Sequence, residues 1–170
     1  HGEPTHGALI YQSTQHVPWI ITMPDAKWAG SKISERVQQV DFMPTMLSLY
    51  DIAQPSTASG RSLLPLLDGE SFGERAMYTE SEYCSLNYGW APLASIVRGK
   101  WKLIDAPTLE LYDLEADPGE LNNLAAQRPD AVESLLSELS ELRAGMQDRA
   151  GLTIESSSEL SSALEALGYA

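Results

Sequence analysis

The sequence has one cysteine, few basic residues and no long hydrophobic run. Because Cys84 stands alone among 170 residues, neither an internal disulfide nor a cysteine-based metal site can form. No apolar stretch approaches the ~18 residues that a membrane-spanning helix needs. Acidic residues outnumber basic ones by 24 to 11, whereas nucleic acids and anionic membranes are bound by basic surfaces. These absences argue against a disulfide-stabilised scaffold, a membrane span and a nucleic-acid partner.

Common catalytic signatures are absent as well. The sequence contains no G-x-S-x-G elbow, no Walker loop, no G-x-G-x-x-G and no H-E-x-x-H. Cys84 has no histidine near it in sequence, which favours an inert core residue over a nucleophile. The pairs Glu80/Glu82 and Asp113/Asp117 are acid–base candidates, but alternation at a strand end or a turn cap explains them more simply. These residues alone do not make a self-sufficient enzyme.

The first part of the chain shows one strand pattern and one helix pattern. Residues 17–22 form a short apolar run that contains Pro18 and ends shortly before Pro24, which indicates a buried strand. Residues 41–50 show three-to-four spacing of apolar residues, which predicts an amphipathic helix with Asp41 as its N-cap and Pro44 in its first turn. The strand has no partner near it in sequence, so we expect it to belong to a sheet whose other strands lie outside this chain.

The second part predicts a small antiparallel sheet and a long helix. Candidate strands cover residues 76–81, 94–98, 101–105 and 109–113, and the Gly99-Lys100 turn favours a hairpin. A helix over 130–149 follows, with an apolar stripe that would lie on the sheet: Val132, Leu135, Leu136, Leu139, Leu142 and Met146.

The expected fold class is therefore α/β for the whole protein and α+β within this chain. We expect residues 1–70 to be the end of an α/β domain. Residues 71–150 would be a sheet-and-helix subdomain with about four antiparallel strands, and residues 151–170 an acidic, serine-rich tail.

Three histidines are present, and two of them lie in one loop. His1 and His6 occur in HGEPTHG, ahead of the first apolar residues. Such a loop can present an imidazole to an anionic substrate, a metal or a proton acceptor, but a surface histidine in a turn has the same spacing. His16 is more simply a packing or capping residue.

Several phrases, in order along the chain, resemble the sulfatases of the alkaline phosphatase superfamily. HGEPTHG with HVPWII is similar to the loop and strand after the metal-binding Asp-His or Asp-Asn of that family. VDFMPTMLSLYDI resembles its V-D-x-x-P-T-x-L helix, and GRSLLPLLDG its G-x-S-L-x-P-L-L-x-G. RGKWKLI and LELYDLEADPGELNNLA resemble its closing hairpin and its L-Y-D-L-x-x-D-P-x-E-x-x-N-L ending. Each phrase is modestly specific, and the ordered set covers the chain to about residue 150.

The resemblance implies an alkaline-phosphatase-like sheet that this chain completes, and it implies site residues. His6 falls where the family places a Lys or His that contacts the sulfate group, which makes it the catalytic and substrate-binding candidate. His1, with Glu3, matches the H-G-E before it and is a weaker candidate. Tyr88 and Trp90, in NYGWAPL, fall at the active-site rim, where they could stack on a substrate; packing in the core is the alternative.

The family's nucleophile and metal site have no counterpart here. The resemblance implies a formylglycine made from C/S-x-P-x-R and a divalent metal, usually calcium, held by aspartates and an Asp-His or Asp-Asn. Cys84 is followed by SLNY and is not the formylglycine position, and no metal ligand is expected in this chain. The resemblance therefore makes the N-terminal half of the same protein, along with a sulfate ester, the expected partner, and we expect the chain alone to be inactive.

The expected function is that of the C-terminal part of a metal-dependent sulfuric-ester hydrolase. A phosphodiester or phosphonate monoester hydrolase of the same superfamily is one alternative, because fold does not fix the substrate. A non-catalytic interaction module is the other. The family resemblance points to a periplasmic or secreted bacterial enzyme.

Overall fold

The computed structural model describes residues 7–150, although of residues 147–150 only the backbone is described. The chain divides into two units, residues 1–139 and 140–170. Every element below belongs to the first unit except the end of the last helix. The serine-rich tail at 151–170 lies outside the described residues, and the expected domain limits at 70 and 150 remain predictions.

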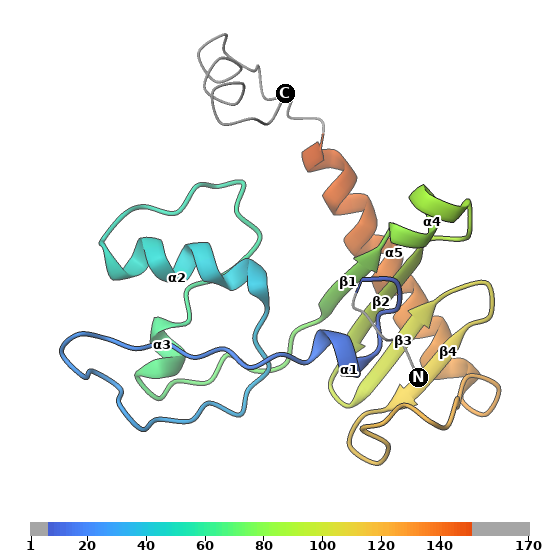
Figure 1. The fold of residues 1–170 in the computed structure, drawn as a ribbon, viewed down its shortest axis with the longest axis horizontal. Coiled ribbons are helices and arrows are strands. Elements are labelled where there is room, and N and C mark those ends of the chain that lie inside the picture. The colour runs from blue at the N-terminus through green and yellow to red at the C-terminus, as the bar shows by residue number, and fades with distance from the viewer. Residues whose placement is uncertain (1–6, 151–170) are drawn as a thin grey trace, which may run out of the picture. The chain divides into compact units, whose positions relative to one another are not determined.

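A four-stranded antiparallel sheet organises the second half of the first unit. Its strands are β1 (Met77–Ser81), β2 (Leu93–Arg98), β3 (Trp101–Asp105) and β4 (Glu110–Asp113). They lie side by side in chain order (Figure 1). Gly99 has a φ of +55° in the tight turn between β2 and β3, a conformation that glycine adopts without steric cost. The sheet predicted from the turn signals and apolar runs is confirmed.

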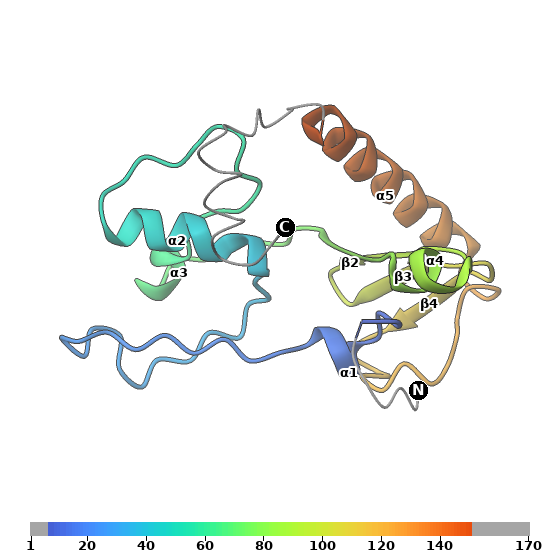
Figure 2. The same ribbon diagram turned by 45° about the horizontal axis from the view of Figure 1, so that its top comes forward.

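One face of this sheet is covered by the first part of the long helix α5 (Pro129–Ala150), up to Leu139. In the first unit its residues Val132, Leu135 and Leu139 are buried, as are Ile96 and Leu103 on the sheet. Glu138 pairs with Arg98 of β2, with 3.5 Å between Nη1 and Oε1, and Figure 2 shows the start of α5 beside this face. The predicted stripe is thus confirmed over residues 132–139. Met146, in the second unit, is 40% exposed.

The opposite face is covered by residues 9–11 and the short helix α1 (Gln12–Gln15). Ile10 is 1% exposed and packs with Val97, Ile104, Tyr112 and Leu114. Because both faces are covered, β2 and β3 are buried along their centres instead of alternating between buried and exposed. The two strands are mostly apolar, in agreement with this burial, and the polar residues Ser95 and Lys102 within them are buried as well.

The strand expected at residues 17–22 is not formed in this chain. The segment has no regular structure, and Val17 and Ile20 are 55% and 85% exposed. A strand needs a neighbour for its N–H and C=O groups, and no described residues pair with this segment. Two short helices were also not predicted, α1 and α4 (Tyr83–Tyr88), because neither is long enough to show a period.

The predicted helix at 41–50 is confirmed as α2 (Phe42–Leu49), which follows the 3-10 turn η1 (Gln39–Asp41). Pro44 lies in its first turn and is buried. Asp41, however, does not cap α2 with its side chain. Its carboxylate instead accepts hydrogen bonds from the backbone N–H groups of Gln38 (2.9 Å) and Arg61 (3.0 Å), and it forms an ion pair with Arg75. The predicted N-cap position of Asp41 is thus confirmed, but its carboxylate binds donors outside α2 in place of the N–H groups of the helix.

α2 is joined at close range to the loop before α3 (Leu64–Leu67). The buried Thr45 hydroxyl donates to the carbonyl of Asp41 at 2.6 Å and accepts the N–H of Leu63 at 3.0 Å. Gly60 touches the backbone of Val40 so closely that an added Cβ would lie 1.9 Å from its carbonyl oxygen. The phrases VDFMPT and GRSL are therefore two sides of one packed junction.

We predict that Asp41→Asn lowers the free energy of unfolding by about 2–4 kcal/mol, because the amide turns an N–H group toward donors and leaves Arg75 without its charge partner. Urea denaturation followed by circular dichroism measures this change. Asp51→Asn is the matched control, since Asp51 is exposed and should change stability by less than about 0.5 kcal/mol. Equal effects of the two substitutions would contradict the role given to Asp41.

Candidate functional site

The segment directly after His6 is attached to the sheet by hydrogen bonds from three separate side chains. The hydroxyl of Ser81, at the end of β1, donates to the carbonyl of Gly7. Lys102 Nζ donates to the carbonyl of Ile10 at 2.6 Å, and the N–H of Gln12 donates to Glu120 Oε2 at 2.5 Å. His6 and His1 themselves lie outside the described residues, so their roles remain predictions.

Two of these side chains form a buried ion pair. Lys102 and Glu120 are each 1% exposed, and their Nζ and Oε1 atoms are 2.7 Å apart. Burial lowers the pKa of Lys102, and the hydrogen bond and charge of Glu120 oppose that shift. Glu120 has a φ of +54°, so a left-handed turn directs its carboxylate into the core.

The turn that carries Glu120 is organised by its neighbours in DPGELNN. Asp117 Oδ2 accepts the N–H groups of Leu121 and Asn122, each at 2.8 Å. The Asn123 side chain accepts from the N–H of Leu111 and donates to the carbonyl of Leu109, both at 3.0 Å. These residues of the family-like ending therefore position Glu120 against β3 and β4.

Tyr11 adds a second polar attachment. Its hydroxyl and that of Tyr112 both donate to Glu110 Oε2, at 2.9 and 2.6 Å, and the two rings meet edge to face. Burial, together with the charge of Glu110, raises the pKa of Tyr11 to about 12. The same causes raise the pKa of Tyr112.

Tyr88 and Trp90 lie together on the surface. β1 leads almost directly into α4, which ends at Gly89 in a left-handed conformation. Tyr88 is 59% and Trp90 65% exposed, with ring centroids 5.5 Å apart, and Tyr83 is 6.1 Å from Tyr88. The two aromatic residues are therefore not core residues. Cys84, on the same helix, is buried, as expected for an inert thiol.

The carboxylate pairs proposed from the sequence have structural partners. Asp113 binds Lys100 at 2.6 Å and accepts the N–H groups of Glu115 and Ala116. The Lys100 hydrogen bond is the main cause that lowers the pKa of Asp113. Glu80 accepts the hydroxyl of Tyr78, and Glu82 that of Ser85. The simpler interpretation of these acidic residues as caps and surface partners fits their contacts.

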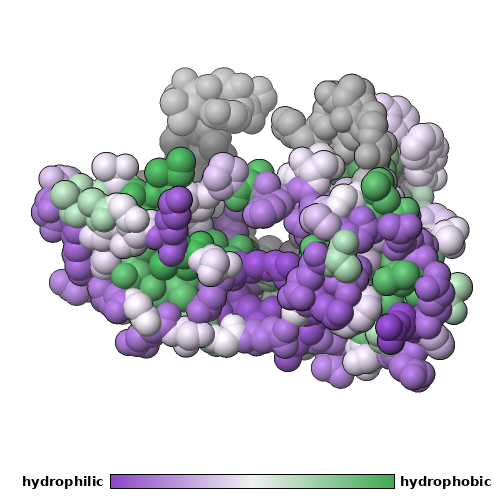
Figure 3. Space-filling view, turned by 90° about the horizontal axis from the view of Figure 1, so that it is seen from below, coloured by the Kyte–Doolittle hydropathy of each residue, from purple (hydrophilic) through white to green (hydrophobic). Residues whose placement is uncertain are grey.

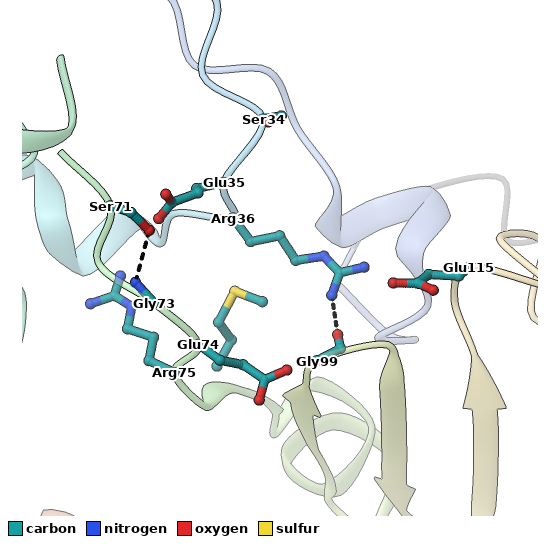
Figure 4. Close-up of a pocket in the computed structure, with 10 residues that line it drawn as sticks. Ser34, Glu35, Arg36, Ser71, Gly73, Glu74, Arg75, Gly99 and Glu115 are labelled. Carbon is teal, nitrogen blue, oxygen red and sulfur yellow. Dashed lines mark hydrogen bonds between the residues drawn. The ribbon is translucent and has the colours of Figure 1, made fainter. Parts of the chain in front are cut away.

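A polar pocket of about 450 Å³ lies elsewhere in the first unit (Figure 4). Glu35, Arg36, Glu74, Arg75 and Glu115 contribute its charges, and Arg36 crosses it to donate to the carbonyl of Gly99. Its hydroxyl groups come from Ser34 and Ser71, and no histidine lines it. None of the predicted site residues borders this pocket, and its residues do not combine a nucleophile with a base.

The described residues do not provide a metal site. Among the side chains described, those of residues 7–146, no group of three or more His, Cys, Asp or Glu could hold an ion. No helix in the same range is long and apolar enough to cross a membrane.

Ser81, Lys102 and Glu120 were not predicted as functional residues. The sequence contains one indication of the buried ion pair. A lysine in the centre of the mostly apolar strand WKLID must either reach the surface or have a buried partner of opposite charge. The identity of that partner depends on the turn at Glu120, 18 residues later, and the role of Ser81 depends on a contact with residue 7.

Comparison with solved structures places this fold in a class. The chain is 29% identical, with a TM-score of 0.54, to a protein solved in complex with its substrate D-glucosamine-2-N,6-O-disulfate, over 64% of this chain and 24% of that one. It is 26% identical, with a TM-score of 0.59, to the phosphonate monoester hydrolase of Agrobacterium radiobacter, over 70% and 27%. The architecture is thus the C-terminal part of an alkaline-phosphatase-like hydrolase.

Sequence comparisons identify the family. Residues 6–145 match the family described as N-sulphoglucosamine sulphohydrolase, C-terminal. The chain is 34% identical to mouse arylsulfatase K over 143 residues, covering 76% of this chain and 25% of that protein. It is 35% identical to the N-acetylglucosamine-6-O-sulfatase of Bacteroides thetaiotaomicron, over 68% and 22%. The chain therefore belongs to the sulfatase family and corresponds to its C-terminal portion, about a quarter of the length of these relatives.

We predict that Tyr11 titrates near pH 12, in place of its ordinary value of 10.0. The folded state then keeps the phenol proton in a range where the unfolded state loses it, so the stability present below pH 10 falls as the pH rises toward 12. Phenolate absorbance and urea denaturation measure the two effects. Tyr11→Phe should remove one high-pH titration and weaken the fall, and Glu110→Gln should lower the pKa of Tyr11. Tyr50→Phe is the control, since Tyr50 is 76% exposed; an unchanged titration curve in Tyr11→Phe would contradict the assignment.

Proposed function

We propose that this chain is the C-terminal part of an enzyme that hydrolyses sulfuric esters. The family match over residues 6–145 carries the proposal, and the relatives named arylsulfatase and N-acetylglucosamine-6-O-sulfatase support it. Because one similar protein was solved with a doubly sulfated glucosamine, a sulfated amino sugar is the first substrate to test.

His6 is the residue of this chain that we assign to the substrate. A protonated imidazole donates hydrogen bonds to sulfate oxygens and stabilises the negative charge that develops on the leaving oxygen. The contacts of residues 7–12 support this role, because the backbone directly after His6 is fixed by buried or half-buried groups. His1 is the weaker candidate in the same loop.

Tyr88 and Trp90 would bind the sugar ring at the rim of the site. Their large exposure and the 5.5 Å between their centroids leave ring faces available for stacking. They follow β1, the strand whose last residue Ser81 binds Gly7. One strand end thus carries both the aromatic pair and an attachment of the His6 loop.

The N-terminal portion of the same protein is the partner that we propose for the exposed apolar surface. Val17, Ile20, Phe42 and Met43 are each more than 45% exposed. Hydrophobic side chains gather on the left of Figure 3, where Figure 1 places α2, α3 and the segments around them. An unpaired extended segment beside such a surface fits a strand that joins a larger sheet.

The nucleophile and the metal would come from that N-terminal portion. By resemblance they are a formylglycine and a divalent ion, calcium in the usual case, which would supply the attacking oxygen and stabilise charge on the sulfate. The residues of this chain would bind and orient the ester. Secretion or export to the periplasm belongs to the same proposal.

Hydrolysis of a phosphonate monoester is the second candidate. The likeness to the Agrobacterium radiobacter phosphonate monoester hydrolase favours it, since one fold can host sites for different substrates. The sulfatase proposal stands first because the named sulfatase relatives share 34–35% of their aligned residues with this chain.

We predict that His6→Ala in the full-length protein lowers kcat/KM for an aryl sulfate by about 10²–10³, the usual loss when one donor to a developing negative charge is removed. Initial rates on an aryl sulfate and on a phenyl phosphonate ester would be measured in parallel. His16→Ala is the matched control, because His16 is exposed and should leave both rates unchanged. A full rate for His6→Ala would exclude the assigned role, and faster cleavage of the phosphonate would favour the second candidate.

We predict that Tyr88→Ala and Trp90→Ala each raise KM for a sulfated saccharide by about three- to tenfold, because stacking is lost. KM for a small aryl sulfate should be unchanged, and stability should change by less than about 1 kcal/mol since both side chains are exposed. Leu86→Ala is the matched control on the same helix, with Leu86 82% exposed. Equal effects on both substrates, or a similar effect of Leu86→Ala, would refute a role in sugar binding.

A further inference from the structure

The Lys102–Glu120 pair contacts the backbone of a single segment. Lys102 Nζ donates to the carbonyl of Ile10 at 2.6 Å, while Glu120 Oε2 accepts the N–H of Gln12 at 2.5 Å. The ammonium group of Lys102 thus binds a backbone carbonyl, and the carboxylate of Glu120 binds a backbone N–H two residues further along the chain. Such a pair sets both the position and the direction of the backbone that it contacts.

Stability alone does not account for this arrangement. Both side chains are 1% exposed, and removing two charges from water costs several kcal/mol per ion, which the mutual attraction offsets only when the geometry is good. Apolar residues of similar size often stabilise a core at least as well. Glu120 also holds a φ of +54°, which a non-glycine residue adopts only at a cost. What the pair adds is a fixed place for residues 10–12.

Ser81 supplies a third attachment, closer to the proposed substrate contact. Its side chain is 9% exposed, and its hydroxyl donates to the carbonyl of Gly7, the residue directly after His6. Gly7 has a φ of +120°, a value that side-chain-bearing residues rarely adopt. The chain direction at this point therefore depends on a residue without Cβ and on one bond from the sheet.

We propose that Ser81, Lys102 and Glu120 are positioning residues that hold the segment 7–12 so that the imidazole of His6 meets the sulfate group. The proposal rests on the function proposed above. Lys102 and Glu120 fix the far end of the segment to the core, and Ser81 fixes the end next to His6. None of the three touches the substrate, and each acts through His6.

A double-mutant cycle in the full-length enzyme tests this proposal. Ser81→Ala should lower kcat/KM for a sulfate ester by about three- to tenfold, the loss expected for one hydrogen bond, and should act mainly on kcat. Glu120→Gln should lower it by more than tenfold, because it leaves a buried Lys102 without its counter-charge. Combined with His6→Ala, each substitution should cost less than about twofold further, because the group that it positions is gone.

Two controls separate positioning from folding. Ser81→Thr keeps the hydroxyl and should restore most of the activity lost in Ser81→Ala. Asp41→Asn perturbs a distant buried carboxylate, and any loss that it causes should be the same with His6 present or absent. If Glu120→Gln does not fold, Ser81→Ala and Ser81→Thr still complete the cycle.

The possible outcomes distinguish the two proposals. Failure of the full-length wild-type enzyme to cleave sulfate esters would refute the proposed function. If the wild type is active, two results would overturn the positioning role alone. One is that Ser81→Ala lowers kcat/KM by the same factor in the wild type and in the His6→Ala background, and the other is that Ser81→Ala has no effect. Loss that disappears in the His6→Ala background, with rescue by Ser81→Thr, is the result we expect.

Discussion

The buried ion pair between Lys102 and Glu120 is the interaction on which the arrangement of the sheet region depends. Lys102 comes from the centre of β3, Glu120 from the turn after β4, and their outward bonds reach Ile10 and Gln12 near the start of the described chain. One pair therefore joins three segments that are far apart in sequence. An ion pair buried away from water is favourable only in a narrow range of geometries. The backbone segment that it contacts is therefore held in a nearly fixed position.

Asp41 has the equivalent role at the junction of α2 and α3. It is fully buried and receives hydrogen bonds or charge from Gln38, Arg61 and Arg75. Thr45 and Gly60 complete the same junction by a shared hydroxyl and by direct backbone contact. The phrases that resemble sulfatases here are thus largely architectural, and they hold the chain in shape around a small number of buried polar groups.

Local patterns predicted the sheet region well, because the turn at Gly99-Lys100 and the apolar stripe of α5 are both encoded within a few residues. They predicted a strand at residues 17–22 that is not formed, because the described residues provide no neighbour for it. They placed Asp41 correctly at the N-cap of α2 but did not show that its carboxylate binds Arg61 and Arg75, which lie 20 and 34 residues further along the chain. For the candidate site, the resemblance supplied His6, Tyr88 and Trp90. The supporting residues Ser81 and Glu120 emerge only from contacts across 74 and 108 residues.

The exposed segment at residues 17–22 has a consequence for handling the protein in solution. An uncovered apolar segment can pair as a strand with the same segment of another molecule and start aggregation. Pro18 lies within this segment and Pro24 follows it, and proline has no N–H with which to extend a ladder. The two prolines therefore limit intermolecular pairing to the few residues between them, fewer than the roughly six of a typical fibre-forming segment, so the segment carries its own protection against aggregation.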